Sequence, residues 1–170
     1  MRPLWIAAVI ACLATAGCSN EPLDVAPQVD LARFQGQWYE IAKLPRHTQA
    51  NCTGTTAFYV TREGGLDVTH QCHLDTLDGP IKSSLARVNG TGESVAAKLS
   101  LDVGGLAYDY WILEVGDHYE YAVVGVPSRE YLWILSRTPQ LDKAKLDGVV
   151  QRMRAAKFDT TRLEYTPQAP

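Results

Sequence analysis

The chain has 170 residues and a formal net charge of −3, from 16 basic and 19 acidic side chains. This length suits one domain with a sizeable core. Because no block or stripe of Lys and Arg occurs, the composition argues against nucleic acid as a partner.

The N-terminal residues have the pattern of an export signal. Arg2 supplies a positive charge, and residues 4–13 form a mostly apolar run too short to span a bilayer. Small residues then lead directly into Cys18. This segment resembles the lipobox of bacterial lipoproteins, in which the cysteine is lipidated and becomes the new N-terminus. The resemblance implies a signal peptide over residues 1–17 and, with Ser19 after the cysteine, an anchor in the outer membrane, with the protein at its periplasmic face. An ordinary secretory signal is the alternative.

The next segment, residues 18–30, contains two prolines and few apolar residues. We expect it to be a lipidated tether that precedes a folded domain over residues 31–167. Behind the anchor two cysteines remain, Cys52 and Cys72. In an exported protein such a pair predicts one disulfide, and a nucleophilic thiol is the alternative.

From residue 35 onward, apolar and polar residues alternate with the period of two that is typical of β-strands. The connections are short and rich in Gly, Pro and Asp, as hairpin turns are. The expected strands cover residues 38–42, 55–61, 66–72, 81–88, 96–103, 108–115, 119–124 and 131–137.

The period changes to that of a helix after Pro139, which we expect near the helix start. Leu146, Val149, Val150 and Met153 lie on one face, so this amphipathic helix should pack outside the sheet. A short final strand fits residues 162–165. The pattern predicts an all-β fold, an eight-stranded antiparallel up-and-down β-barrel with one C-terminal α-helix packed outside. A sandwich competes, but it more often needs long crossovers.

Three motifs in this order resemble the signatures of the lipocalin family. Residues 36–42 read G-Q-W-Y-E-I-A and resemble its first signature. Residues 131–139 resemble the closing signature of bacterial outer-membrane lipocalins and of apolipoprotein D. Residues 111–124 match the middle signature in their hydrophobic frame but lack its usual T-D-Y. The resemblance implies a calyx with one open end that holds a small apolar ligand, and eight strands leave room for one.

The resemblance also implies that Trp38 and Arg137 meet at the closed end of the barrel. A guanidinium over an indole is worth about 0.5 to 2 kcal/mol, so this pair should be structural. If both side chains point inward, alternation places Glu40 and Ala42 on the inner face of the first strand. We expect Glu40 to be a buried carboxylate partnered near Arg137, with a polar anchor in the cavity as the alternative. Alternation assigns these residues to the ligand cavity: Val68, His70, Tyr131, Trp133 and Leu135. The resemblance to apolipoprotein D implies that Tyr59 and Trp133 face the ligand. Trp133 as plain core packing stays open.

The candidate chemistry is sparse. No H-x-x-x-H or C-x-x-C pattern is present, so the sequence predicts no metal site and no cofactor, and His70 should be a polar wall residue. Cys52 is expected in a loop at the open end, where a bond to Cys72 would tie a lid to the rim.

We therefore expect a binding protein for a fatty acid, a lysophospholipid or a similar apolar molecule, used in lipid storage, transport or envelope maintenance. One alternative is a catalytic lipocalin that uses Cys72, resembling the prostaglandin D synthase. Another is an envelope scaffold whose barrel is filled by its own side chains. The sequence leaves a monomer and a homodimer both open.

Overall fold

A computed structural model of the chain describes residues 21–92 and 96–169. The expected signal peptide, the lipidation site Cys18 and the first residues of the expected tether lie outside these described residues. Within them, no helix is both long and apolar enough to cross a membrane.

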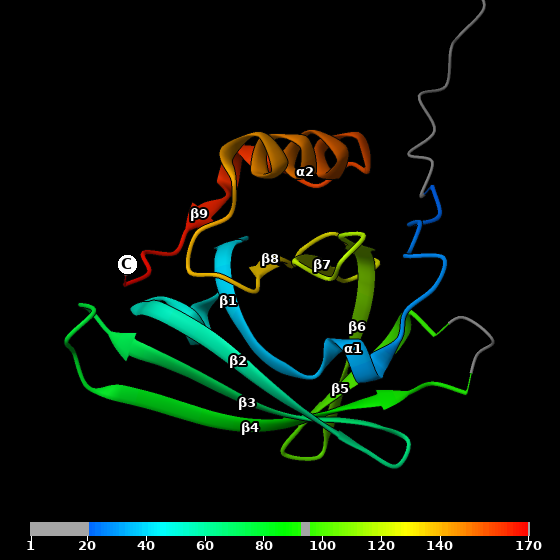
Figure 1. Cartoon of the computed structure of the whole chain (residues 1–170), viewed down its shortest axis with the longest axis horizontal. Coiled ribbons are helices and arrows are strands. Elements are labelled where there is room, and N and C mark those ends of the chain that lie inside the picture. Colours follow the sequence, from blue (N-terminus) through cyan, green and yellow to red (C-terminus); the bar gives the residue numbers. More distant parts are fainter. Residues whose placement is uncertain (1–20, 93–95, 170) are drawn as a thin grey trace, which may run out of the picture.

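The described residues form a closed antiparallel β-barrel, as the alternation predicted (Figure 1). Each strand from β2 to β7 pairs with the next along the chain, β8 pairs with β1, and β1 pairs with β2 to close the barrel. The strands are β1 (Gly36–Lys43), β2 (Cys52–Arg62), β3 (Gly65–Leu74), β4 (Ile81–Gly90), β5 (Lys98–Val103), β6 (Leu106–Val115), β7 (Tyr121–Gly125), β8 (Leu132–Ser136) and β9 (Glu164–Tyr165).

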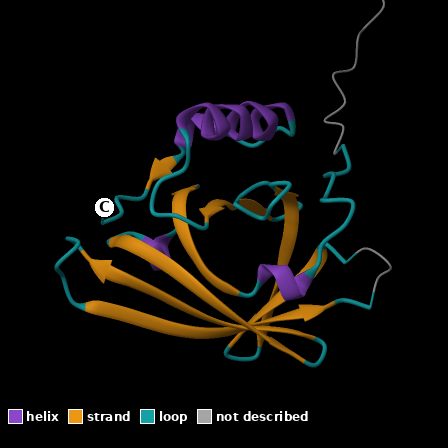
Figure 2. Cartoon of the chain, viewed as in Figure 1, coloured by secondary structure: helices purple, strands orange, loops and turns teal. Residues whose placement is uncertain are grey.

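The helix α2 (Lys143–Ala155) lies outside the barrel, as predicted (Figure 2). Val149 and Met153 of α2 are buried against outward-facing residues of β1, β6, β7 and β8. The helix begins later than Pro139 suggested, because Asp142 is its N-cap and accepts a hydrogen bond from the Lys145 amide at 3.0 Å. A short 3₁₀ helix, η2 (Thr160–Arg162), then leads into β9.

β1 contains an irregularity that changes which residues face the barrel interior. Its pairing with β8 shifts register between Glu40 and Ala42. Trp38 belongs to the core inside the barrel, whereas Ala42 belongs to the core between the barrel and α2. The expectation that Ala42 faces inward is therefore wrong, because a bulge interrupts strict alternation.

The residues expected to form a tether differ from that expectation where the structure describes them. Leu23 and Ala26 are buried, and the Ala26 amide donates to the Ile112 carbonyl at 2.9 Å. The segment continues into a one-turn helix, α1 (Leu31–Phe34), whose N-cap is Asp30. Figure 1 shows α1 lying across one end of the barrel. α1 was not predicted, because a single turn carries no helical period.

Candidate functional site

A cavity of about 350 Å³ lies inside the barrel. Strand direction identifies its mouth, because β1 ends, β2 begins and the β3–β4 turn lies at the same end of the barrel. Basic and polar side chains from this end reach the cavity: Arg46, Thr48, Gln49 and Lys82. The deeper wall is mainly apolar and aromatic: Ala57, Tyr59, Leu101, Tyr110, Val124 and Leu135. The arrangement suits an elongated molecule with an apolar body and a polar end.

Two tyrosines form the deep end of the cavity. The hydroxyl groups of Tyr59 and Tyr110 are 2.6 Å apart, and both residues are buried. Burial raises the pKa of Tyr59 to about 12 and raises the pKa of Tyr110 well above its ordinary value, so both are protonated at neutral pH. Phe34 of α1 packs edge-on against Tyr59, with 5.1 Å between ring centroids. Beyond this pair the barrel is filled by side chains.

The closed end is built around Trp38 and Arg137. The Arg137 guanidinium lies 3.8 Å from the centroid of the Trp38 ring, which is the contact that the resemblance implied. Its nitrogens also donate to the main-chain carbonyls of Gln37, at 2.9 Å, and Arg33, at 2.6 Å. The Trp38 indole nitrogen donates to the Phe34 carbonyl at 2.7 Å. One side chain thus joins β1, the end of β8 and α1.

The remaining residues expected in the cavity divide into two groups. His70, Trp133 and Leu135 line it, together with Tyr59. Val68 does not line it: its side chain is buried in the core inside the barrel, opposite Tyr59 in the β2–β3 ladder and therefore at the level of the cavity floor. Alternation gave its direction but not its depth.

Tyr131 also lies outside the lining. It precedes β8, and its ring stacks on Trp133 with 6.1 Å between centroids. Arg46 lies over both rings, at 5.1 and 5.5 Å from their centroids. Tyr131 is therefore a rim residue that buttresses the wall residue Trp133.

Glu40 is buried, but its partners are not the expected ones. One carboxylate oxygen accepts from Gln49 Nε2 at 2.9 Å, and the other accepts from Thr166 Oγ1 at 2.6 Å. Burial raises the pKa of this carboxyl above its ordinary value. The expectation of a partner near Arg137 is wrong, because Glu40 lies two residues nearer the mouth than Trp38 and Arg137 stays at the closed end.

His70 faces the cavity from β3. Burial, with a smaller contribution from the Arg46 charge, lowers its pKa to about 4. The imidazole is therefore neutral at pH 7. Within the described residues no group of three or more His, Cys, Asp or Glu side chains could hold a metal ion.

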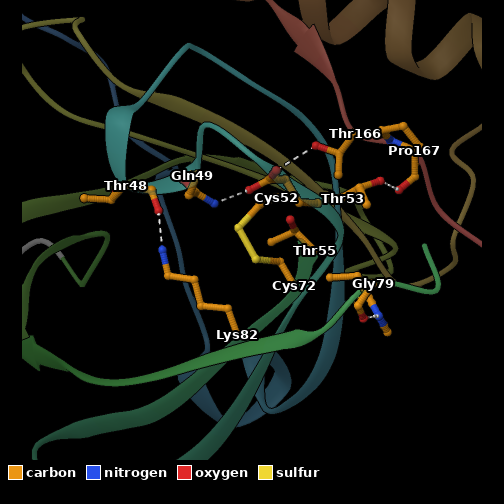
Figure 3. Close-up of a disulfide and its surroundings, with 12 residues drawn as sticks. Thr48, Gln49, Cys52, Thr53, Thr55, Cys72, Gly79, Lys82, Thr166 and Pro167 are labelled. Carbon is orange, nitrogen blue, oxygen red and sulfur yellow. Dashed lines mark hydrogen bonds between the residues drawn. A yellow bond between two sulfur atoms is a disulfide. The ribbon is translucent and has the colours of Figure 1, made fainter. Parts of the chain in front are cut away.

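The predicted disulfide joins Cys52 to Cys72 across β2 and β3, with their Cα atoms 5.3 Å apart. Cys52 is the first residue of β2 and not a loop residue, and the ladder shifts register between Thr53 and Thr56, next to the bridge. A 3₁₀ turn, η1 (His47–Gln49), lies just before it. Figure 3 shows the bridge at the mouth, beside the hydrogen bond from Lys82 to the Thr48 carbonyl.

The sequence analysis missed a strap at the mouth, formed by β9 and residues 166–168. β1 pairs with β2 only over residues 36–39, so the two strands separate toward the mouth. There β9 pairs with β1, and the Pro167 carbonyl accepts from the Gly54 amide of β2 at 2.8 Å. Gln168 bridges both strands by donating to the Glu40 and Thr55 carbonyls, at 2.8 and 2.9 Å (Figure 3 shows Pro167 beside Thr53). The only sequence signal for this strap was the short strand expected at residues 162–165.

Comparison with known proteins agrees with this architecture. A family model described as a Lipocalin-like domain matches residues 29–168. The outer membrane lipoprotein Blc of Vibrio cholerae is 31% identical over 173 residues that cover 99% of each chain. The protein of that name from Escherichia coli K12 is 33% identical and is covered over 97% of its length by 99% of this chain. The solved structure of insecticyanin from Manduca sexta aligns with a TM-score of 0.67 at 20% identity, over 87% of this chain and 84% of that one, and supports the fold.

Proposed function

Because this chain belongs to the lipocalin family, we propose that it binds a single-chain amphiphilic lipid, such as a fatty acid or a lysophospholipid. The observation that carries the proposal is the unfilled cavity of about 350 Å³, with apolar walls and a polar mouth. Burial of the acyl chain against these walls supplies most of the affinity.

The mouth gives the proposed orientation of the lipid. Arg46 and Lys82 both reach the cavity there. Within the described residues, Glu40 is the only acidic side chain that lines the cavity, and it lies on the wall with both of its oxygens already hydrogen-bonded. An anionic head group, carboxylate or phosphate, therefore binds at the rim, and the acyl chain extends toward the Tyr59–Tyr110 pair.

The proposed location is the outer membrane, through a lipid on Cys18, with the barrel at the periplasmic face. Two relatives that align with nearly the whole chain are named outer membrane lipoproteins, and the residues before Cys18 have the pattern of a lipoprotein signal. The role in the cell is lipid storage, transport or envelope maintenance. In a cell fractionation, Cys18→Ser should release the protein from the membrane, whereas Cys12→Ser should leave it there.

The two alternative functions receive less support. A nucleophilic Cys72 needs a free thiolate, and its sulfur is bonded to Cys52. A scaffold filled by its own side chains is at odds with the unfilled cavity. Binding is therefore favoured over catalysis and over a purely structural role.

Fluorescence tests the proposal directly. Of the tryptophans after Cys18, Trp133 lines the cavity, whereas Trp38 is enclosed at the closed end and Trp111 packs toward α2. Palmitate added to delipidated protein should change the tryptophan emission with a stoichiometry of one. Trp133→Phe should lose most of this change, while calorimetry still reports binding.

No binding of palmitate or lysophosphatidylcholine by calorimetry would overturn the proposal. Native mass spectrometry of protein extracted from its own membrane would identify a retained lipid, and the same spectrum would distinguish a monomer from a homodimer.

A further inference from the structure

The Tyr59–Tyr110 pair has more hydrogen-bonding capacity than the protein uses. Each phenol has one proton to donate. The 2.6 Å contact between the two oxygens uses one of these protons, and no other hydrogen bond is found for either hydroxyl among the described residues. Since burial keeps both phenols protonated at neutral pH, one donor proton is left over at the deep end of the cavity.

Both tyrosines line the cavity, so an acceptor placed there is the partner within reach of the spare proton. The neighbouring wall there is apolar, including Leu101, Val124 and Leu135. A buried water needs two to four polar partners to be well held, so this part of the cavity is a poor site for water alone. A buried donor without an acceptor is costly. An acceptor atom carried in by a ligand would satisfy it.

We propose that the cavity binds acyl chains that carry a second oxygen, a hydroxyl or a carbonyl, at the end distant from the head group. The tyrosine pair donates the spare proton to this oxygen. The inference rests on the proposed function, and it narrows the ligand to a molecule that is polar at both ends.

Strand register sets the distance between the two polar ends. Lys82 at the mouth is opposite Cys72, and Tyr59 is opposite Val68, four residues further along β3. Four residues of a strand span about 13 Å. An oxygen close to the head group therefore cannot reach the tyrosine pair while the head stays at the rim, whereas an oxygen at the chain end can.

The experiment compares palmitate with ω-hydroxypalmitate by calorimetry, using α-hydroxypalmitate as the matched ligand whose hydroxyl lies beside the head group. In the wild type, ω-hydroxypalmitate should bind at least as tightly as palmitate. In the double variant Tyr59→Phe/Tyr110→Phe the distal hydroxyl enters an apolar site without a partner, so the ω-hydroxylated acid should bind tenfold or more weaker than palmitate. The dissociation constant of α-hydroxypalmitate divided by that of palmitate should be the same in the wild type and in the double variant.

The inference is overturned, and the proposed function left intact, if the affinity of ω-hydroxypalmitate relative to palmitate is equal in the wild type and the double variant. Failure of the wild type to bind any of the three acids overturns both. Tyr108 is well exposed and does not line the cavity, so Tyr108→Phe is the control for loss of a tyrosine hydroxyl as such. If the double variant does not fold, the wild-type measurement still tests the inference. Binding of ω-hydroxypalmitate to the wild type that is tenfold weaker than binding of palmitate would contradict it.

Discussion

The two ends of the barrel are held together in different ways. At the closed end, Arg137 bonds main-chain carbonyls and lies over Trp38, so aromatic packing and local hydrogen bonds complete the structure. At the mouth, β1 and β2 separate, and a disulfide, a buried carboxylate and the strap formed by β9 and residues 166–168 span the gap. The closed end thus contributes mainly stability, while the mouth combines stability with access to the cavity.

The largest effect is expected at the closed end. Trp38→Ala removes a side chain with no exposed surface and should lower the free energy of unfolding by about 3 to 5 kcal/mol. Palmitate affinity of the fraction that remains folded should change little. Urea unfolding and calorimetry measure the two quantities. Trp111→Ala, on the helix-facing side, is the control and should cost less. A collapse of affinity at unchanged stability would mean that the closed end had been assigned to the wrong end of the barrel.

The disulfide comes next. Cys52→Ser/Cys72→Ser removes a bridge with a sequence separation of 20 and should cost about 3 kcal/mol, because the unfolded chain gains conformational freedom. Urea unfolding of the wild type with a reductant should show the same loss, and the double variant should not respond to the reductant. Two titratable thiols in the unreduced wild type would contradict the bridge.

Removal of the strap should lower stability less than removal of the disulfide does, and it should mainly change how easily a ligand passes through the mouth. Truncation after Tyr165 deletes the hydrogen-bond partners of Glu40, Gly54 and Thr55. It should lower the free energy of unfolding by about 2 kcal/mol, because these polar groups lose their protein partners. The dissociation rate of palmitate, followed by stopped-flow fluorescence, should rise. Removal of residues 169–170 alone is the control. An unchanged dissociation rate would show that the strap does not restrict access.

His70 should make the stability depend on pH. Its pKa is about 4 in the folded protein and about 6.5 when exposed. Between these values the unfolded state binds a proton that the folded state does not, so stability is lost as the pH falls from about 6.5 to about 4. Because the side chain is only half-buried at the cavity wall, we expect a loss of about 1 to 2 kcal/mol. The His70→Gln variant should lack this part of the loss when urea unfolding is compared at several pH values. Parallel curves for the two proteins would contradict the lowered pKa.

The smallest effect is expected at Thr55. Its hydroxyl is buried at the mouth without a hydrogen-bond partner among the described residues. Thr55→Val has a similar shape and removes that group, so stability should stay within about 0.5 kcal/mol or rise slightly. Thr53→Val, which loses the contact with the Pro167 carbonyl, is the matched comparison and should be less stable than Thr55→Val in the same thermal melts.

Much of the barrel followed from the sequence because alternation and short turns are local signals. They predicted the order of the strands, the outer helix, and the inward direction of His70 and Trp133, whereas the place of Tyr59 came from the resemblance to apolipoprotein D. The bulge in β1 was not predictable in this way, because it depends on how β1 meets β8 in space, and it moved Ala42 to the outer core.

The finer parts of the cavity could not be read from the sequence for a related reason. Depth along the barrel depends on register between strands, which placed Val68 at the level of the cavity floor formed by Tyr59. The partners of Glu40 lie in η1 and in the strap, nine and 126 residues away along the chain. A short polar segment such as residues 166–168 carries no periodic signal, so its position follows only from the completed fold.

The position of β1 has a consequence for how the barrel assembles. β1 is the earliest strand in the chain and pairs with β2 only over residues 36–39, while its other partners, β8 and β9, are the latest strands. The hairpins from β2 to β8 can form between neighbours as the chain emerges, while the second edge of β1 stays open until strands about a hundred residues away are made. Long-range pairing of this kind slows folding and leaves strand edges open in the meantime. We therefore expect the last kinetic phase of refolding to be the docking of β8 and β9 onto β1, and assistance by chaperones to matter most before that event.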